Sequence, residues 1–303
     1  MAEHSTPAAA RVGSVSPRTW TALELLQTTA RYFEEHRVEA PRLAAERLLA
    51  HVLACRRVDL YLSGDRVLAA SELDRYRELV RKRASGEPLQ YLVGETEFMG
   101  LTFHTDRRAL IPRPETEILV DALAKRFGAT ATPVRFLELG CGSGALAVSL
   151  AVLLPHAEVW SSERSPQAAT LALSNARRHE VAARVHVLVM DRFTALAPEL
   201  AGGFHCVVSN PPYVSSAELG RLPAIVRDHE PLTALDGGPD GLDYHRALCD
   251  EGLQFLCSGG TLAVEIGAEQ GDAVRRLFEA ARLNDTSVIP DYAGHPRVVL
   301  GQR

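Results

Sequence analysis

The amino-acid sequence predicts an α/β fold with a mostly parallel sheet, preceded by a small helical bundle and a linking β-hairpin. A strand-like run at 134–139 feeds a glycine turn and then an uninterrupted helical run at 145–154. Strand, glycine turn and helix are the usual opening of a nucleotide-binding α/β domain. Short apolar runs alternate with helical segments beyond it, whereas residues 19–85 show helical spacing throughout. We therefore expect two domains of different class.

The length and composition allow both domains and exclude a membrane protein. A chain of 303 residues with 46% hydrophobic residues has room for about two packed cores. No apolar run approaches the roughly 20 residues of a membrane span, and residues 1–16 lack the apolar centre of a signal peptide. We therefore expect a cytoplasmic protein without membrane association.

The distribution of charge and the cysteine pattern limit the classes of ligand and partner that we expect for this chain. The net charge is −5, with an excess of +2 in residues 1–90 and −7 in the remainder. A broad nucleic-acid surface would need a basic stripe, which this distribution lacks. The five cysteines include no Cys-x-x-Cys pair, and no histidines cluster at metal-ligand spacing. We expect reduced thiols and no metal site.

Three amphipathic runs make up the predicted bundle. Residues 19–36 carry apolar side chains at helical spacing, with Thr19 as the candidate N-cap. Residues 41–54 repeat the pattern and begin with a proline, which suits the first turn of a helix. Ser71-x-x-Asp74 resembles a capping box and opens the third helix.

The pattern changes at Gly86, where short β-like runs at 89–93 and 101–104 suggest a hairpin. Prolines at alternate positions then hold residues 111–117 extended, and a helix with an acidic first turn follows. This segment is either a stiff linker or a wall over a binding site. The predicted organisation is a flexible tail, a helical domain, a hairpin linker and an α/β domain, bounded as 1–18, 19–85, 86–112 and 113–303.

The glycine turn suggests a bound nucleotide-like ligand. It reads Gly140-Cys141-Gly142-Ser143-Gly144 and follows Glu138. Glycines let the backbone approach a ligand that a Cβ would exclude, although this spacing differs from the Gly-x-Gly-x-x-Gly that binds a pyrophosphate. A second strand at 158–162 ends in Glu163, 19 residues after Gly144, which is close to the distance at which an acidic side chain reaches ribose hydroxyls. An exposed surface residue is the alternative.

The next two predicted strands also end in polar residues. Residues 184–190 form the third strand, after which Asp191 could hold an adenine amino group while Arg192 or Phe193 covers the ring. Residues 205–209 form the fourth strand and lead into Asn-Pro-Pro-Tyr at 210–213. Two prolines cannot continue a central strand, so they stiffen the chain at the edge where open α/β sheets bind ligands.

The Asn-Pro-Pro-Tyr stretch suggests a site for a planar NH₂ group. The side-chain oxygen of Asn210 and the backbone carbonyl of Pro211 are acceptors that together suit the two hydrogens of an amide. Tyr213 supplies a flat face beside them. Taken alone, the stretch could equally be a turn after a strand.

Taken together, the Glu138-x-Gly-x-Gly-x-Gly turn, Glu163 and the Asn-Pro-Pro-Tyr stretch resemble the class I methyltransferases that use S-adenosylmethionine (SAM). Further stretches resemble the HemK/PrmC family, which methylates peptide-chain release factors; they lie at 41–53, 86–91, 111–117, 230–235 and 291–301. The resemblance implies a Rossmann-like sheet whose last strand is antiparallel. It also implies methyl transfer from SAM, leaving S-adenosylhomocysteine, to N5 of the glutamine in the Gly-Gly-Gln motif of class I release factors.

The resemblance also implies roles for individual residues. Those expected to bind the cofactor are Glu138, Gly140, Cys141, Gly142, Gly144, Glu163, Asp191, Arg192 and Asn210. Those expected to bind the substrate are Asn210, Pro211, Pro212, Tyr213 and Glu230, of which Asn210, Pro211 and Tyr213 are expected to be catalytic. Four positions depart from the family pattern. Glutamate stands at 138 and 163 where aspartate is commoner, Arg192 replaces an apolar or aromatic residue, and His229 stands where an aromatic residue commonly precedes Glu-Pro.

Two further segments bear on recognition of the substrate. The glycine-rich loop at 236–241 is either a surface turn or a wall of the glutamine pocket. The helical domain is expected to recognise the body of the release factor, because a tripeptide offers little surface for selectivity. We expect a monomer.

Other functions stay open at this point. One alternative is an N-methyltransferase of another protein glutamine or of adenine N6 in nucleic acid, and another is a non-catalytic SAM-binding adaptor. The absence of a basic surface and of a separate base-reading domain argues against nucleic acid. The intact Asn-Pro-Pro-Tyr stretch argues against an adaptor, and the glycine spacing argues against a nicotinamide-dependent dehydrogenase.

Overall fold

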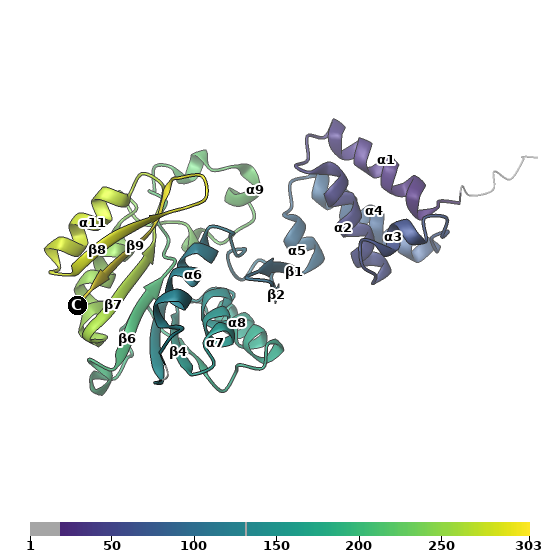
Figure 1. Cartoon of the computed structure of the whole chain (residues 1–303). Coiled ribbons are helices and arrows are strands. Elements are labelled where there is room, and N and C mark those ends of the chain that lie inside the picture. Colours follow the sequence, from purple (N-terminus) through teal and green to yellow (C-terminus); the bar gives the residue numbers. More distant parts are fainter. Residues whose placement is uncertain (1–18, 131) are drawn as a thin grey trace, which may run out of the picture. The chain divides into compact units, whose positions relative to one another are not determined.

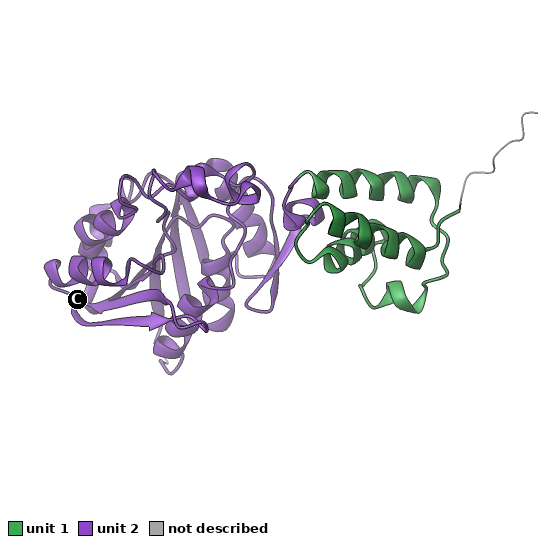
Figure 2. Ribbon diagram, turned by 90° about the horizontal axis from the view of Figure 1, so that it is seen from above, with its two compact units in different colours: residues 1–85 green, residues 86–303 purple. Residues whose placement is uncertain are grey.

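The structure, a computed structural model, describes residues 19–130 and 132–303. The tail expected at 1–18 lies outside the described residues. The chain divides into two compact units, residues 1–85 and 86–303, which Figure 2 shows in different colours. Each unit is described by itself below.

The first unit is a helical bundle of four described helices, labelled in Figure 1. Their bounds are α1 (Ala22–Glu35), α2 (Pro41–Leu53), α3 (Asp59–Leu62) and α4 (Ala70–Ala84). α2 packs against both α1 and α4. Tyr76 of α4 is fully buried, and its hydroxyl donates to the backbone oxygen of Ala45 in α2 (3.2 Å). The core of the bundle thus holds apolar side chains together with a tyrosine whose hydroxyl has a hydrogen-bond partner.

Two of the predicted helix starts were wrong. α1 is capped by Thr21 rather than Thr19, because Thr21 and Glu24 form a reciprocal capping pair. α4 begins before Ser71, and the carboxylate of Glu72 accepts a hydrogen bond from the backbone nitrogen of Ala69 (2.9 Å). The short helix α3 was not predicted, since four residues carry too little periodicity to detect.

The predicted hairpin is present but displaced. The run expected as its first strand is helix α5 (Leu89–Val93), and the strands are β1 (Glu95–Phe98) and β2 (Leu101–His104). Pro88 precedes α5, and Gly94 ends it in the left-handed region at a φ of 82°. Proline before a helix and glycine after it are boundary signals that outweigh the β-like composition of the run.

The second unit is built on a seven-stranded sheet with the order β5-β4-β3-β6-β7-β9-β8. The strands are β3 (Val134–Leu139), β4 (Ala157–Glu163), β5 (Val185–Val189), β6 (Phe204–Ser209), β7 (Leu256–Glu265), β8 (Asn284–Pro290) and β9 (Pro296–Gln302). β3 to β7 pair in parallel, while β9 runs antiparallel to both β7 and β8. The Rossmann-like sheet and antiparallel last strand are confirmed. β9 is an internal strand, and β8 forms the edge.

Helices cover both faces of this sheet (Figure 1). The helices of the unit, besides α5, are α6 (Thr116–Phe127), α7 (Ala145–Leu153), α8 (Pro166–Arg178), α9 (Ala224–Arg227), α10 (Asp243–Ala247) and α11 (Gly271–Ala280). Alternate residues of β3 point to opposite faces, so Phe136 joins the core under α6 and α7 while Leu137 joins the core under α11. Both faces of the central strands are therefore buried, as their apolar sequences require.

Within the described residues, no helix is long and apolar enough to cross a bilayer. Nor do three or more His, Cys, Asp or Glu side chains of that part of the chain group together as a metal site would need.

Candidate active site

A cavity of about 410 Å³ opens at the carboxyl ends of the central strands. The sheet order reverses between β3 and β6, which follow each other in space but not in sequence. Open α/β sheets bind their ligands at such a switch point. Nine of the predicted site residues line this cavity, namely Glu138, Gly140, Cys141, Gly142, Glu163, Asp191, Arg192, Asn210 and Pro212. Gly144, Pro211, Tyr213 and Glu230 stand outside the lining.

The glycine turn after β3 has the shape its sequence predicts. Gly140 has a φ of 75° and lines the cavity, and a Cβ at this position would meet no atom within 4 Å. A side chain there would project into space that a ligand can occupy. Gly144 has a φ of 80°, and a Cβ there would lie 3.0 Å from the Cα of Ala172 in α8. Glycine at 144 therefore permits close packing of the turn against α8.

Cys141 lies in the same turn with its thiol at the cavity wall and only 6% of its surface exposed. Its backbone nitrogen donates to the carbonyl of Ser162 at the end of β4 (3.2 Å). Burial raises the pKa of the thiol well above its usual range, and the nearby carboxylates of Glu138 and Glu163 raise it further. The side chain is a neutral thiol that packs rather than reacts.

Glu163 braces the glycine turn from the end of β4. One carboxylate oxygen accepts a hydrogen bond from the backbone nitrogen of Gly142 (2.9 Å), and the other accepts from that of Ser165 (2.8 Å). Ser165 in turn caps α8 through its side chain, which accepts from the backbone nitrogen of Ala168 (3.2 Å). The two oxygens have remaining lone pairs, so the same carboxylate can also face ligand hydroxyls.

Glu138 is almost completely buried behind the turn, with 2% of its surface exposed. The hydroxyl of Ser161 donates to its carboxylate (2.6 Å). Burial raises the pKa of Glu138 to about 7; the Ser161 hydrogen bond opposes this rise and the charge of Glu163 adds to it. A buried carboxylate beside a cavity is a natural counter-charge for a cationic ligand.

Asp191 and Arg192 follow β5 at the far wall of the cavity. Arg192 adopts a left-handed backbone conformation with a φ of 50°. Its guanidinium pairs with Glu251 (2.6 Å), which holds the planar group at the cavity edge. This placement is compatible with a guanidinium stacked on a ring, which stays a prediction.

Asn210 reaches the cavity from the end of β6. Its side-chain nitrogen donates to the hydroxyl oxygen of Thr116, the first residue of α6 (2.9 Å). Pro212 lines the cavity beside it, and the hydroxyl of Tyr213 lies 3.5 Å from a carboxylate oxygen of Glu265. Burial raises the pKa of Tyr213 to about 12, and the charge of Glu265 contributes, so Tyr213 stays a neutral donor.

Glu230 is buried behind the cavity wall, where it binds two residues of that wall. Its carboxylate accepts from the backbone nitrogen of Ile111 (3.1 Å) and pairs with the guanidinium of Arg113. Ile111 and Arg113 line the cavity, whereas Glu230 does not. The extended segment at 111–113 is therefore part of the wall, and Glu230 fixes it.

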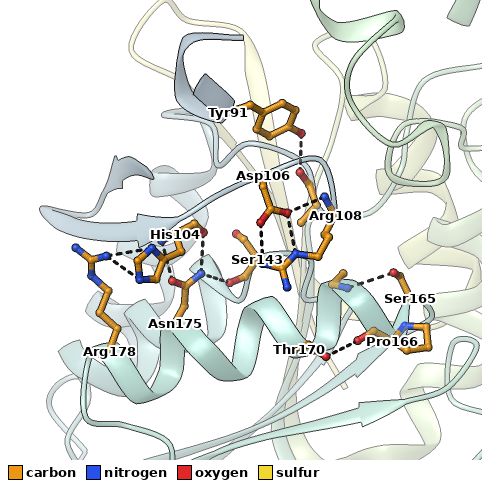
Figure 3. A network of polar contacts seen from close by, with 12 residues as sticks. Tyr91, His104, Asp106, Arg108, Ser143, Ser165, Pro166, Thr170, Asn175 and Arg178 are labelled. Carbon is orange, nitrogen blue, oxygen red and sulfur yellow. Dashed lines mark hydrogen bonds and ion pairs between the residues drawn. The ribbon is translucent and has the colours of Figure 1, made fainter. Parts of the chain in front are cut away.

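A second polar network ties the hairpin to the glycine turn, as Figure 3 shows. Asn175 of α8 accepts from the backbone nitrogen of His104 (2.8 Å) and donates to its carbonyl (3.0 Å). The same amide donates to the carbonyl of Ser143 (2.9 Å). Further along, Asp106 pairs with Arg108 (2.7 Å), which lines the cavity. The end of β2 is thus tied to the glycine turn through Asn175, and the segment that follows holds Arg108 at the cavity.

The sequence missed three residues of this site. Asn175 lies in the middle of a helix, Thr116 belongs to a stretch interpreted only through its prolines, and Glu265 follows an apolar run without a recognised motif. An asparagine in a helix interior is one signal that could have been used, because its amide seldom favours that position without a tertiary partner.

Two family models match this chain. One, described as the PrmC N-terminal domain, matches residues 24–94, and the other, described as the methyltransferase small domain, matches residues 114–226.

Full-length relatives are also similar. The release factor glutamine methyltransferase of Geobacter sulfurreducens is 41% identical over 286 residues, which are 94% of this chain and 98% of that protein. The protein of the same name from Moorella thermoacetica is 43% identical over 267 residues, covering 88% of this chain and 93% of its own length. Among solved structures, the hMettl16 catalytic domain in complex with a 3′UTR hairpin has a TM-score of 0.55 at 14% identity. That match covers 78% of this chain and 84% of the other, and concerns the fold alone.

Proposed function

Because this chain belongs to the release factor glutamine methyltransferase family, we propose that its cavity binds SAM and that residues 210–213 hold a glutamine of a class I release factor for methylation at N5. The observation that carries these residue roles is the hydrogen bond from the Asn210 nitrogen to Thr116. Since the nitrogen is engaged there, the Asn210 oxygen is left as an acceptor at the cavity wall.

The cavity suits the cofactor on three counts. The glycine turn leaves open space at Gly140 for the ligand backbone or sugar. The carboxylate of Glu163 stands at the end of β4, where it would accept hydrogen bonds from the ribose hydroxyls. Glu138 supplies a negative charge near the cationic sulfur, and Asp191 with Arg192 would face the adenine. These roles of Glu138, Gly140, Cys141, Gly142, Glu163, Asp191 and Arg192 are part of the proposal.

The chemistry demands alignment more than acid or base strength. A glutamine nitrogen is a poor nucleophile because its lone pair is delocalised into the carbonyl group. When bound, SAM supplies a methyl group on positively charged sulfur, which the nitrogen accepts as S-adenosylhomocysteine forms and a proton leaves for water. The Asn210 oxygen and the Pro211 carbonyl would accept the two amide hydrogens and hold the nitrogen in line. Such positioning lowers a barrier by as much as about 7–11 kcal/mol.

Acceptors aimed at the nitrogen also stabilise the positive charge that develops on it during transfer. The ring of Tyr213 would pack on the amide plane, and the backbone of Pro212 would form the floor. The glycine-rich loop at 236–241 supports this arrangement, since a Cβ at Gly237 would lie 2.7 Å from the Pro212 carbonyl oxygen. Such close packing fits a loop that shapes the glutamine pocket. Glu230 would serve the same pocket by fixing Ile111 and Arg113.

The helical unit would recognise the body of the release factor. Exposed apolar side chains are frequent on this unit and include Val58 (53% exposed), Tyr61 (44%), Leu62 (76%) and Val67 (54%), which lie within ten residues of one another on α3 and on either side of it. Exposed apolar clusters on a folded protein commonly mark partner surfaces. We assign this α3 surface to the release factor.

Further properties belong to the same proposal. The reaction would need no metal, so activity should survive EDTA. The enzyme would act as a monomer on release factors in the cytoplasm, without binding nucleic acid directly.

The decisive test is methyl transfer from labelled SAM to a purified, unmethylated release factor, with mass spectrometry to locate the label. A release factor in which the Gly-Gly-Gln glutamine is replaced by asparagine is the control. Label on that glutamine alone supports the proposal. Label elsewhere, or none while SAM binds, overturns the substrate assignment.

The role of Asn210 is tested separately by Asn210→Ala. Loss of turnover is expected with unchanged fold and SAM affinity, because the substituted residue retains no acceptor for the substrate amide. Near-normal turnover would remove Asn210 from the mechanism.

A further inference from the structure

Two segments of the cavity wall, 107–113 and 229–234, meet at a pair of side chains that the reaction described above does not use. A guanidinium nitrogen of Arg107 lies 3.2 Å from Nδ1 of His229. In both segments, the residues that follow this pair line the cavity. The Arg107–His229 contact thus joins two parts of the wall that are 122 residues apart in the sequence.

The direction of this hydrogen bond follows from chemistry. A guanidinium has only N–H donors, so Nδ1 of His229 must be the unprotonated acceptor and the ring proton must be on Nε2. The Arg107–His229 contact therefore exists only while the imidazole is neutral. Once Nδ1 is protonated it can only donate, and two positively charged groups then face each other in place of the hydrogen bond.

Both partners of the contact are placed by further neighbours. The same guanidinium nitrogen of Arg107 lies 3.0 Å from a carboxylate oxygen of Glu87. The ring of His229 lies near the turn at Gly86, where a Cβ would be 3.8 Å from Nε2 and the backbone has a left-handed φ of 101°. The turn at 86–87 therefore helps to set the two side chains against each other.

We propose that His229 is a positioning residue for the cofactor site: while neutral, it binds Arg107 and holds the two wall segments together around SAM, and its protonation releases them. This inference rests on the proposed binding of SAM in the cavity. Neither His229 nor Arg107 lines the cavity, so the pair acts through the residues beside it. Histidine side chains gain a proton as the pH falls from about 8 to 5, so SAM affinity should decrease over that range.

The other charged groups around the contact are already paired. Each of the nearby carboxylates binds a guanidinium: Asp228 with Arg227, Glu230 with Arg113, Glu87 with Arg107, and Asp106 with Arg108. The Arg227 guanidinium holds the pKa of Asp228 below its usual range, and burial raises the pKa of Tyr91, whose hydroxyl stays neutral. Because these charges are compensated, a proton on His229 adds an excess positive charge beside Arg107.

The expected effect is modest, because 55% of the Arg107 side chain is exposed. A hydrogen bond at such a site changes affinity by about 3- to 10-fold. The contacts of Glu230 with the same wall remain when the Arg107–His229 contact breaks, so the segments loosen at one end only. Phenylalanine is a suitable substitution for His229, since it keeps a flat ring and has neither an acceptor nor a titratable group.

The test measures the SAM dissociation constant of full-length variants by titration calorimetry at about pH 8. Arg107→Met and His229→Phe should each raise it by about 3- to 10-fold. The double variant should bind SAM no more weakly than the weaker single variant, because both changes break one contact. His229→Asn keeps an acceptor near the place of Nδ1 and should stay within about 2-fold of the unsubstituted protein. His295→Phe, at an exposed position between β8 and β9, is the matched control and should change nothing.

A comparison of two pH values separates this role from simple packing. With histidine at 229, the loss of affinity caused by Arg107→Met should shrink to less than about 2-fold at about pH 5.5, because the contact is already broken there. In the His229→Asn background the loss should be equal at both pH values, since asparagine does not titrate. Glu138, whose pKa burial raises to about 7, also titrates in this range, but it is common to all variants and cancels in these ratios.

The outcomes distinguish this inference from the proposed function. If the unsubstituted protein binds SAM while Arg107→Met and His229→Phe keep its dissociation constant within about 2-fold, the positioning role is refuted and the cofactor site stands. An equal loss from Arg107→Met at both pH values, with histidine at 229, refutes release by protonation. Failure of the unsubstituted protein to bind SAM refutes the cofactor site and this inference together. Should His229→Phe fold poorly, as judged by circular dichroism, Arg107→Met in the native and His229→Asn backgrounds decides alone.

Discussion

Asn175, in helix α8, donates a hydrogen bond to the backbone oxygen of Ser143 in the glycine turn (2.9 Å). The same side chain also bonds both backbone polar groups of His104 in β2. Three segments that are far apart in sequence therefore depend on one buried amide, as the labelled residues of Figure 3 make clear. This amide helps to fix the shape of the glycine turn before a ligand binds.

Asn175→Ala should weaken SAM binding by about 10-fold and lower the free energy of unfolding by about 2–3 kcal/mol, because two carbonyls and one N–H lose their partner. Isothermal titration with SAM and urea unfolding would measure the two effects. Asn284→Ala, at an exposed position on β8, is the control and should change neither. An unchanged SAM affinity in Asn175→Ala would show that the turn keeps its shape unaided.

Glu163→Gln should raise the SAM dissociation constant by about 10- to 100-fold, since one oxygen that now accepts from Gly142 or Ser165 becomes a donor and the charge is lost. Titration calorimetry checks this, and Glu199→Gln on the exposed surface is the control. Binding of the release factor in the absence of SAM should not change. An effect confined to the release factor would contradict a ribose-binding role.

Glu138→Gln should stabilise the fold at alkaline pH while weakening SAM binding. The folded-state pKa of Glu138 is raised to about 7 from 4.5, so folding favours the protonated form. The contribution of the protonated Glu138 to the free energy of unfolding is fully present below about pH 4.5. It is lost as the pH rises through about 7, which lowers that free energy by about 3 kcal/mol. Urea unfolding at pH 5 and pH 8 would show the variant gaining stability mainly at pH 8. A gain at both values would point to packing instead.

Glu230→Gln should retain the contact to Ile111 and lose the ion pair with Arg113, lowering kcat/KM for the release factor by about 10-fold. SAM affinity should fall as well, because Ile111 and Arg113 line the cofactor cavity. Kinetics with varied SAM and varied release factor separate the two effects. A change in release-factor KM alone would favour direct contact between Glu230 and the substrate.

Leu62→Asp should raise the KM for intact release factor by about 10-fold while leaving kcat unchanged, since a charge on the apolar α3 surface disfavours burial by a partner. Leu153→Asp, at an exposed leucine of α7, is the matched control. Equal effects of both substitutions would remove the α3 surface from substrate recognition.

Much of the second unit could be predicted because its signals are local. The strands at 134–139 and 205–209 were apolar runs ended by glycine or proline, and both are found within one residue of the expected bounds. Cavity-lining residues such as Glu163 and Asn210 followed from their places at strand ends. Parallel strands bring such residues together whatever the intervening sequence.

The rest depends on partners that no local pattern encodes. Glu230 joins Ile111 across 119 residues, and Asn210 joins Thr116 across 94. From the sequence alone, Glu230 before a proline suggests only a loop, because the groups that donate to its carboxylate are far away in the chain. Thr116 after an extended segment suggests only the start of a helix. The strand predicted at 89–93 was wrong for a different reason. The composition of this run suits both strand and helix, and the flanking Pro88 and Gly94 favour the helix.

The buried thiol of Cys141 bears on how the enzyme tolerates oxidants. Sulfenic acid forms on thiolates that peroxide can reach, and Cys141 is neither ionised nor exposed. Cys55 and Cys257 are more exposed and would be modified before it. The wall of the cofactor cavity is thereby spared during oxidative stress, so release-factor methylation should outlast the modification of other cysteines in the same chain.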